Sequence, residues 1–258
     1  MTIDPHDPGF ADAGIVDPVP LRGLHGHLLE LLGTRIADGS LKPGEQIVPE
    51  LIAQSVSVSR TVVREVLKVL ESKGLVTARQ RKGTRVSPEQ EWNVLDPDVI
   101  RWRSIGPSSA RQLSELLALR GAVEPLAART ASTAASEDDL RALDECAAKM
   151  DAAVTDQDWS AFTNADVTFH RALLHASGSL AIDRIADPIE AAIRVRHQLR
   201  LIPKVLSHEM TQRHRDIVDA IRNHDSSAAE AASRQLVDVA GDETMITLSK
   251  VSSESAAG

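Results

Sequence analysis

The stretch SVSRTVVREVL, residues 57–67, is the best guide to the fold of the N-terminal part of this chain. Arg60 and Arg64 lie four residues apart and Lys68 follows after four more, so a helix of 3.6 residues per turn places all three on one face. The other face carries branched apolar residues: Val62, Val63, Val66, Leu67 and Leu70. The apolar face can pack against a core. The basic face is either a solvated surface or a binding site for an anion.

The residues around this stretch predict two further helices. Apolar residues recur at helical spacing from Leu24 to Ile36, before a Lys-Pro-Gly turn, and a second, short helix is expected from Pro49 to about Ser55. The helix that bears the basic row should run from Arg60 to about Lys73, with Ser59 as its N-cap and Gly74 at its end.

A hairpin follows these helices. LVTAR (75–79) and TRVSP (84–88) alternate apolar and polar residues on either side of QRKG (80–83), a basic turn that contains glycine. Helix, short helix, turn, helix and hairpin make a winged helix-turn-helix, which we assign to residues 21–87.

Charge is distributed unevenly along the chain. Residues 21–86 contain eleven Lys and Arg against six Asp and Glu, a balance of +5, whereas the whole chain carries −8, so the remainder sums to −13. This separation predicts a small module that binds a polyanion, joined to an acidic body. Aromatic residues make up 2% of the chain and tyrosine is absent, which argues against a platform that stacks single-stranded bases.

Beyond the hairpin the sequence predicts helices and no strands. We expect a disordered tail over 1–20, a linker over 88–107 with one short helix near 98–104, a helical bundle over 108–249 and a tail over 250–258. The helices expected in the bundle are 108–133, 137–155, 158–176, 179–200 with a kink at Pro188, 203–223 and 226–249. The fold class is therefore mainly α.

Neither targeting signals nor enzyme motifs are present in the sequence. It has no apolar run of about 18 residues, and its acidic, proline-rich N-terminus lacks the regions of a signal peptide. We therefore expect a cytoplasmic protein that does not bind a membrane. The single cysteine, Cys146, cannot form a disulfide within the chain and is expected to pack in a helix. No HExxH, GxSxG, P-loop or Rossmann glycine pattern occurs.

Several segments resemble one family of regulators. VSRTVVREVLKVLESKGLV (58–76) and RKGTRV (81–86) are similar to the winged-helix signature of the GntR transcription regulators. Three later segments resemble the all-helical, effector-binding FCD domain of the family's FadR-type branch: LRGAVEPLAARTAS (119–132), DVTFHRALLHASGS (166–179) and RHRDIVDAIRNHD (213–225). The likeness extends over roughly residues 22–245. With these motifs, WNVLDPDVIRW (92–102) is most similar to repressors of galactonate and gluconate catabolism.

The resemblance assigns the basic row to DNA. In the family this third helix enters the major groove, the arginines matching Arg60 and Arg64 contact bases and phosphates, and the wing reaches toward the minor groove. The residues expected to bind DNA are Ser59, Arg60, Thr61, Arg64, Lys68, Arg81, Lys82 and Gly83. One position departs from the family, since Glu50 stands where an arginine is often found at the start of the second helix. The operator sequence can differ accordingly.

A pair of residues in the second half suggests a metal site. Asp166 and His170 are spaced i, i+4, so both side chains lie on one helix face and can bind the same ion. The resemblance implies His214 as a third ligand and places the family's fourth ligand 22 residues further on, where this chain has Leu236. These residues would hold a divalent transition metal, zinc first and nickel or manganese as alternatives, with positions open for water or an effector carboxylate. The alternative is that Asp166 and His170 are neighbours by chance, because a helical chain with nine histidines will often place one beside an aspartate.

The resemblance also implies a site for a carboxylate. Arg120 matches a family arginine that faces the effector pocket, where its guanidinium can hold a carboxylate by two hydrogen bonds; the alternative is an ion pair with Glu124 at i+4. Arg194 and Arg196 are weaker candidates because either can face solvent, and of the two we expect Arg194 to bind the effector. The histidines that we assign to the surface or to packing are His175, His197, His208 and His224.

Together these features predict a homodimeric, ligand-controlled transcription regulator and not an enzyme. It should be a repressor that binds a palindromic double-stranded operator and leaves it when a small carboxylate such as galactonate or gluconate binds. Two alternatives stay open: a metal-dependent hydrolase that uses the Asp, His, His cluster, and an effector-independent DNA-binding protein. Trp92 and Trp102 are expected to pack against the bundle or the DNA-binding domain and to couple the two.

Overall fold

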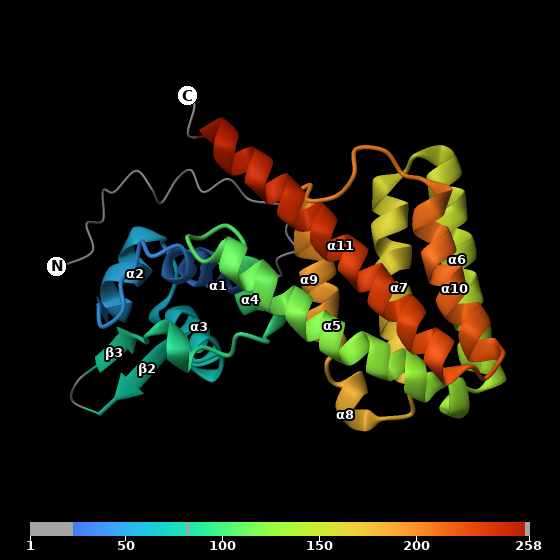
Figure 1. The fold of residues 1–258 in the computed structure, drawn as a ribbon. Helices are drawn as coiled ribbons and strands as arrows, with labels where there is room; N and C mark the ends of the chain where they lie inside the picture. Colours follow the sequence, from blue (N-terminus) through green and yellow to red (C-terminus); the bar gives the residue numbers. More distant parts are fainter. Residues whose placement is uncertain (1–22, 81–82, 256–258) are drawn as a thin grey trace. The chain divides into compact units, whose positions relative to one another are not determined.

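The computed structural model describes residues 23–80 and 83–255 of the chain (Figure 1). The predicted tail over 1–20 and the wing residues Arg81 and Lys82 lie outside the described residues. In the described part, no helix is both long and apolar enough to cross a membrane.

The chain divides after Ser109, and the first unit is the predicted winged helix-turn-helix. Its elements are α1 (Gly23–Ala37), α2 (Pro49–Ser55), α3 (Arg60–Ser72), β2 (Val76–Arg79) and β3 (Gly83–Val86). The Ser59 side chain accepts a hydrogen bond from the amide of Val62 and caps α3, as the sequence predicted. The apolar face of α3 is buried through Val63, Val66, Leu67 and Leu70.

A third strand, which the sequence did not predict, completes the sheet. β1 (Gln46–Ile47) pairs antiparallel with β3, so the strand order is β1-β3-β2 and β3 is central. Two residues are too few to show an alternation of apolar and polar side chains. Because Ile47 is buried in the helical core, β1 ties the base of the wing to that core.

Residues 88–107, predicted as a linker, pack on this first unit. The segment contains a short 3-10 helix, η2 (Glu89–Glu91), and α4 (Pro97–Arg103). Trp102 of α4 lies in the core of the first unit with 1% of its surface exposed, and its indole N–H donates to Glu30 at 2.9 Å. Trp92 packs against the same core. Both tryptophans therefore anchor this segment to the first unit.

The second unit is an all-helical bundle, also as predicted. Its helices are α5 (Ser109–Ala134), α6 (Glu137–Asp156), α7 (Trp159–Ala176), α8 (Leu180–Asp183), α9 (Ala186–Gln198), α10 (His208–Arg222) and α11 (Ser226–Ser255). Helix α7 packs on α6 and α9, while α10 packs on α6 and α11 (Figure 1). The buried core includes Leu143, Met150, Phe169, Leu173 and Ile217, and Cys146 packs there as expected.

Three helix boundaries differ from the prediction. The helix expected over 179–200 is divided into α8 and α9, and Pro188 lies in the first turn of α9 instead of kinking a longer helix. Proline is tolerated there because the first amides of a helix have no intrahelical partner. Helix α10 starts later than predicted, at His208, and α11 continues beyond its predicted end, to Ser255.

Candidate metal centre, effector cavity and DNA face

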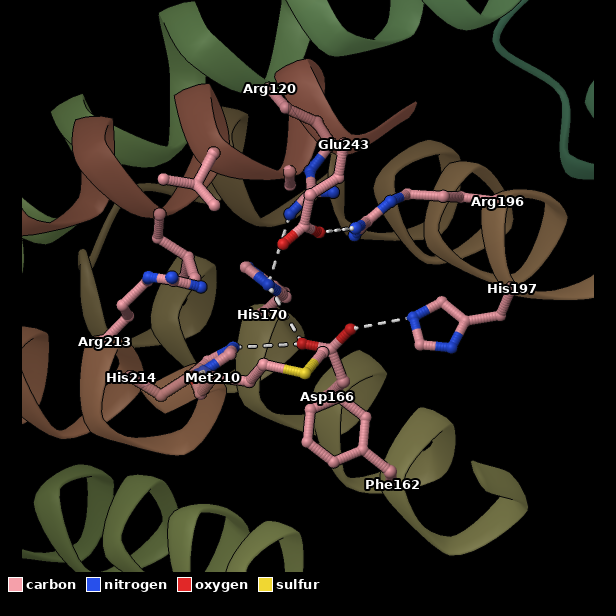
Figure 2. Close-up of a pocket in the computed structure, with 13 residues that line it drawn as sticks. Arg120, Phe162, Asp166, His170, Arg196, His197, Met210, Arg213, His214 and Glu243 are labelled. Atoms are coloured by element: carbon pink, nitrogen blue, oxygen red, sulfur yellow. Dashed lines mark hydrogen bonds and ion pairs between the residues drawn. The ribbon is translucent and has the colours of Figure 1, made fainter. Parts of the chain in front are cut away.

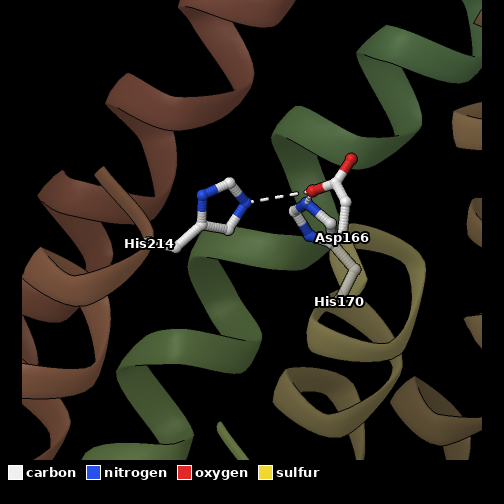
Figure 3. A group of neighbouring side chains, drawn as sticks. All are labelled: Asp166, His170 and His214. Atoms are coloured by element: carbon white, nitrogen blue, oxygen red, sulfur yellow. Dashed lines mark hydrogen bonds and ion pairs between the residues drawn. The ribbon is translucent and has the colours of Figure 1, made fainter. Parts of the chain in front are cut away.

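Helices α7 and α10 bring the three predicted metal ligands together (Figure 3). Asp166 and His170 project from α7, and His214 reaches them from α10. The Nε2 atoms of His170 and His214 lie 3.3 and 3.0 Å from Oδ1 of Asp166. One ligand atom of each residue lies within 4.8 Å of the other two, and all three side chains are buried.

The hydrogen bonds of His214 assign its tautomer. Its Nδ1 lies 2.8 Å from the carbonyl oxygen of Met210, which can only accept, so Nδ1 carries the proton. In the neutral ring the bare Nε2 then faces Oδ1 of Asp166 at 3.0 Å, two lone pairs in contact. A positive charge between them, a proton or a metal ion, removes this repulsion. Histidine ligands of metals commonly donate their second N–H to a carbonyl in this way, so the donor set fits a divalent transition metal.

A buried carboxylate supports His170 from the other side of the ring. Nδ1 of His170 lies 3.0 Å from Oε2 of Glu124, off the line of the N–H bond, and Arg120 donates to the same carboxylate at 2.6 Å. Burial acts against the charge of Glu124, but Arg120 and His170 lower the pKa of its carboxyl to about 2. Burial lowers the pKa of His170 most strongly, but the charge of Glu124 and the contacts with Glu124 and Asp166 together raise the pKa above its ordinary value.

His197, which we assigned to the surface or to packing, packs against the rings of Phe162 and Trp159 and also contacts Asp166. Its Nε2 lies 3.4 Å from Oδ2 of Asp166, and its side chain is 6% exposed. Its Nδ1 lies 2.7 Å from the Thr163 hydroxyl, whose own proton goes to a backbone carbonyl, so Nδ1 carries the proton here as well. Burial would raise the pKa of Asp166, but its contacts with the three histidines and the charge of His170 hold it well below its ordinary value. No local spacing links His197 to Asp166; the packing of α9 on α7 brings them together.

The cluster lines a cavity to which α5, α7, α9, α10 and α11 all contribute (Figure 2). The cavity volume between the lining side chains is about 30 Å³, and the cavity is partly open to solvent. The arginines that line it are Arg120, Arg196 and Arg213. Because Arg120 also pairs with Glu124, its two proposed roles, ion pair and pocket residue, are compatible. Leu236 lines the cavity too and offers no donor atom to a metal.

The expectation for Arg194 needs correction, because this residue does not line the cavity. Its guanidinium donates to Glu190 and Asn164, and 40% of its side chain is exposed. The weaker candidate, Arg196, faces the cavity with 9% of its side chain exposed. Residues two positions apart on a helix point in directions that differ by about 200°, so Arg196 points into the cavity and Arg194 points away from it.

In the first unit, α3 presents its basic row to solvent. Arg60, Thr61, Arg64 and Lys68 are all exposed. A groove beside the helix is lined by Arg60, Arg64 and Lys68. The Ser59 oxygen accepts the amide hydrogen of Val62, so the hydroxyl proton can be donated to a phosphate.

An acidic residue interrupts this basic groove. Glu50, in the first turn of α2, lines the same groove, and its carboxylate lies 3.9 Å from the guanidinium of Arg60. A phosphate approaching Arg60 would meet this negative charge. In the wing, Gly83 begins β3 with a φ of +72°, a conformation that glycine adopts without strain, and the two basic residues before it lie outside the described part.

Comparison with known proteins identifies the family. Residues 24–86 match the family model of bacterial regulatory proteins, gntR family, and residues 115–239 match that of the FCD domain. The galactonate operon transcriptional repressor of Escherichia coli (strain K12) is 30% identical over 208 residues, which cover 80% of this chain and 90% of that protein. The chain belongs to the GntR family and carries an FCD domain.

Other comparisons agree with this assignment. The uncharacterized HTH-type transcriptional regulator YieP of the same bacterium is 28% identical over 211 residues, 81% of this chain and 90% of that protein. The structure of Lar, which controls the expression of the Listeria monocytogenes agr system, has the same fold, with a TM-score of 0.60, 17% identity and coverage of 87% of this chain and 97% of that one. This GntR-family chain is a DNA-binding transcription regulator and not an enzyme, so the hydrolase alternative is excluded.

Proposed function

We propose that this GntR regulator is a homodimeric repressor that leaves its operator when a sugar acid such as galactonate or gluconate binds the second unit. The observation that carries the proposal is the cavity in which Arg120, Arg196 and Arg213 converge with the buried Asp, His, His cluster. A guanidinium binds a carboxylate by two parallel hydrogen bonds. The similarity to a galactonate operon repressor supports a sugar acid as the carboxylate.

Asp166, His170 and His214 are the residues that would hold a divalent transition metal, with zinc, nickel and manganese as candidates. The ion would supply a Lewis-acid centre for oxygen atoms of the effector. The chain's own contribution is an Asp166 carboxylate that keeps its charge although it is buried, and histidine rings whose orientation is set by Met210 and Glu124. Because Leu236 offers no ligand atom, an ion held by these three residues would be left able to accept an oxygen atom of the effector.

On DNA, we expect α3 to enter the major groove through its basic row, with Ser59 and Thr61 at its N-terminus and the wing residues Arg81, Lys82 and Gly83 toward the minor groove. A homodimer would place two such helices on a palindromic operator in the cytoplasm, with twice the contacts of one unit. Footprinting of the full chain should show two half-sites related by a dyad. Occupation of a single asymmetric half-site by a monomer would contradict the proposal.

Thermal unfolding tests the effector class directly. Galactonate and gluconate should raise the melting temperature of the protein, because a ligand that binds the folded state alone stabilises it, and added zinc should increase the shift. Lactate and a fatty acyl thioester serve as competing carboxylate and lipid chemistries. Stabilisation by those two alone would show that the sugar-acid assignment is wrong.

A further inference from the structure

Helix α11 inserts a carboxylate of its own into the cavity. Glu243 lines the cavity beside Arg196, and its Oε2 accepts a hydrogen bond from Nη2 of that arginine at 2.6 Å (Figure 2). The side chains of the two residues are 25% and 9% exposed. Nε of Arg196 donates to the carbonyl oxygen of Leu201 at 3.2 Å, so the guanidinium is fixed at one side by backbone and at the other by Glu243.

The position that Glu243 fills is one where an anion is required. Arg196 is buried near a second arginine: burial first, and then the charge of Arg120, lower the pKa of its guanidinium, whereas Glu243 and Asp166 act in the opposite direction. Without a carboxylate at this point, the buried guanidinium of Arg196 would lose its ion pair and would lie beside the like charge of Arg120, whose own carboxylate partner is Glu124.

The carboxylates that pair with the three cavity arginines are placed differently. Glu124 lies on the same helix as Arg120 and has no exposed surface, so a ligand cannot reach it. Glu209 pairs with Arg213 at 2.6 Å, but it is 76% exposed and does not line the cavity. Glu243 lines the cavity and comes from a different helix than its arginine. It is therefore the partner that an incoming carboxylate can replace without disturbing the bundle core.

We propose that Arg196 is the anchor for the effector's carboxylate and that Glu243 occupies this anchor as an internal substitute until the effector displaces it. The inference rests on the proposed function for the class of ligand, a small organic carboxylate, but not for its identity. Displacement would break the ion pair between α9 and α11. The part of α11 that follows Glu243, up to Ser255, is then where effector binding loosens the second unit.

Sodium acetate is the probe for this exchange, because it carries the carboxylate without any sugar hydroxyls. Full-length protein with bound zinc is titrated with acetate, and binding is followed by the methyl resonances of Leu236, which lines the cavity. Glu243→Gln keeps the size of the side chain but removes the competing charge, so acetate should bind about tenfold more tightly than to the unmodified protein. Arg196→Lys, which lacks the two-pronged donor, should weaken acetate binding at least tenfold.

Glu190→Gln is the matched control. It removes a carboxylate that pairs with Arg194 at 2.9 Å, and neither of these two residues lines the cavity, so acetate affinity should not change. If both glutamine variants bound acetate more tightly by the same factor, the cause would be a general effect of net charge, and the proposal would be overturned. Unchanged affinity in Glu243→Gln, with its melting temperature within a few degrees of the unmodified protein, would overturn it as well.

Amide hydrogen exchange gives a second, independent measurement. Acetate should accelerate exchange in α11 after Glu243 in the unmodified protein, whereas in Glu243→Gln exchange there should be fast before acetate is added. Slow exchange in both states would contradict the displacement. If acetate behaves as expected but galactonate and gluconate do not bind, the sugar-acid assignment fails and the anchor stands. If galactonate releases the operator while Glu243→Gln changes the affinity for neither acetate nor galactonate, the proposal for Arg196 and Glu243 is wrong and the proposed function is retained.

Discussion

Gly33 of α1 lies directly against the indole ring of Trp102 of α4. A Cβ atom on Gly33 would stand 2.5 Å from Cδ2 and Cε2 of that ring, far inside van der Waals contact. The ring is further held by its N–H, which donates to Glu30, and by the guanidinium of Arg101, which lies 5.7 Å from the ring centroid. The segment between the two units is therefore fastened to the DNA-binding unit, so a movement of α4 would carry the winged helix with it.

Gly33→Ala should destabilise the first unit by about 1 to 3 kcal/mol, because the added methyl group overpacks the site and displaces the indole. This loss opposes the gain of up to about 1 kcal/mol that alanine gives over glycine inside a helix. Gly241→Ala is the control, since nothing lies within 4 Å of a Cβ at that position of α11, and it should leave stability unchanged or raised. Urea unfolding measures both. Equal stability of Gly33→Ala and the unmodified protein would contradict the α1–α4 contact.

Arg64→Ala should weaken operator binding by about 1 to 3 kcal/mol and relax sequence preference without unfolding the protein. Arg64 is exposed on α3 and lines the groove beside this helix, so its side chain is not part of the core. Arg141→Ala, at an exposed arginine of the second unit, is the control for loss of one positive charge. Fluorescence anisotropy with labelled operator measures the affinities. Equal operator binding by both variants would refute the assignment of α3 as the recognition helix.

Sequence patterns within a single helix predicted those features of the two sites that depend on that helix alone. Ser59 capped α3 as expected, because an N-cap depends on residues three positions apart. Asp166 and His170 met because i, i+4 positions share a helix face. His214 came through the resemblance, and the structure places it 3.0 Å from Asp166.

Contacts between distant helices could not be predicted in this way. His197, Arg196 and Glu243 reach the cavity through the packing of α9 and α11, and each looks like an ordinary polar residue in its own helix. The error over Arg194 has the same origin, since two arginines separated by one residue give no sign of which faces inward. No glycine lies between α8 and α9. The helical spacing of apolar residues therefore continues across the break, and the sequence predicted one helix.

Glu124 should make the metal-free protein sensitive to acid. Its pKa falls from 4.5 to about 2 in the folded chain, so the unfolded chain takes up the proton first as the pH drops. The corresponding stabilisation, about 3 kcal/mol, is present above pH 4.5 and is lost as the pH falls toward 2. Glu124→Gln should be less stable at pH 7, because Arg120 is left buried without its carboxylate, and the gap to the unmodified protein should shrink at lower pH. Urea unfolding at pH 7, 5, 4 and 3 measures this gap, and a constant gap would contradict the ion pair.

The cluster around Asp166 is the point at which effector binding would be converted into a change in operator affinity. An effector can shift the dimer only by the difference between its affinities for the two states, which in allosteric systems is typically about 1 to 3 kcal/mol. Loss of one imidazole removes a ligand of the candidate ion and a contact of Arg120, whose Nη2 lies 3.2 Å from Nε2 of His170. Both the metal and the arginine side of the effector site are then affected.

His170→Ala should therefore abolish release of the operator by galactonate while leaving operator binding without effector nearly intact, because the substitution is made in the second unit and not in the winged helix. His175→Ala is the matched control: it also removes a histidine of α7 that lies beside an aspartate, Asp183 at 3.4 Å, but 70% of that side chain is exposed and it does not line the cavity. The control should be released at the same galactonate concentration as the unmodified protein. Anisotropy titrations of labelled operator, with galactonate added in steps and zinc present throughout, measure all three proteins. A His170→Ala protein that is still released at the normal galactonate concentration would show that Asp166, His170 and His214 stabilise the bundle and do not sense the effector.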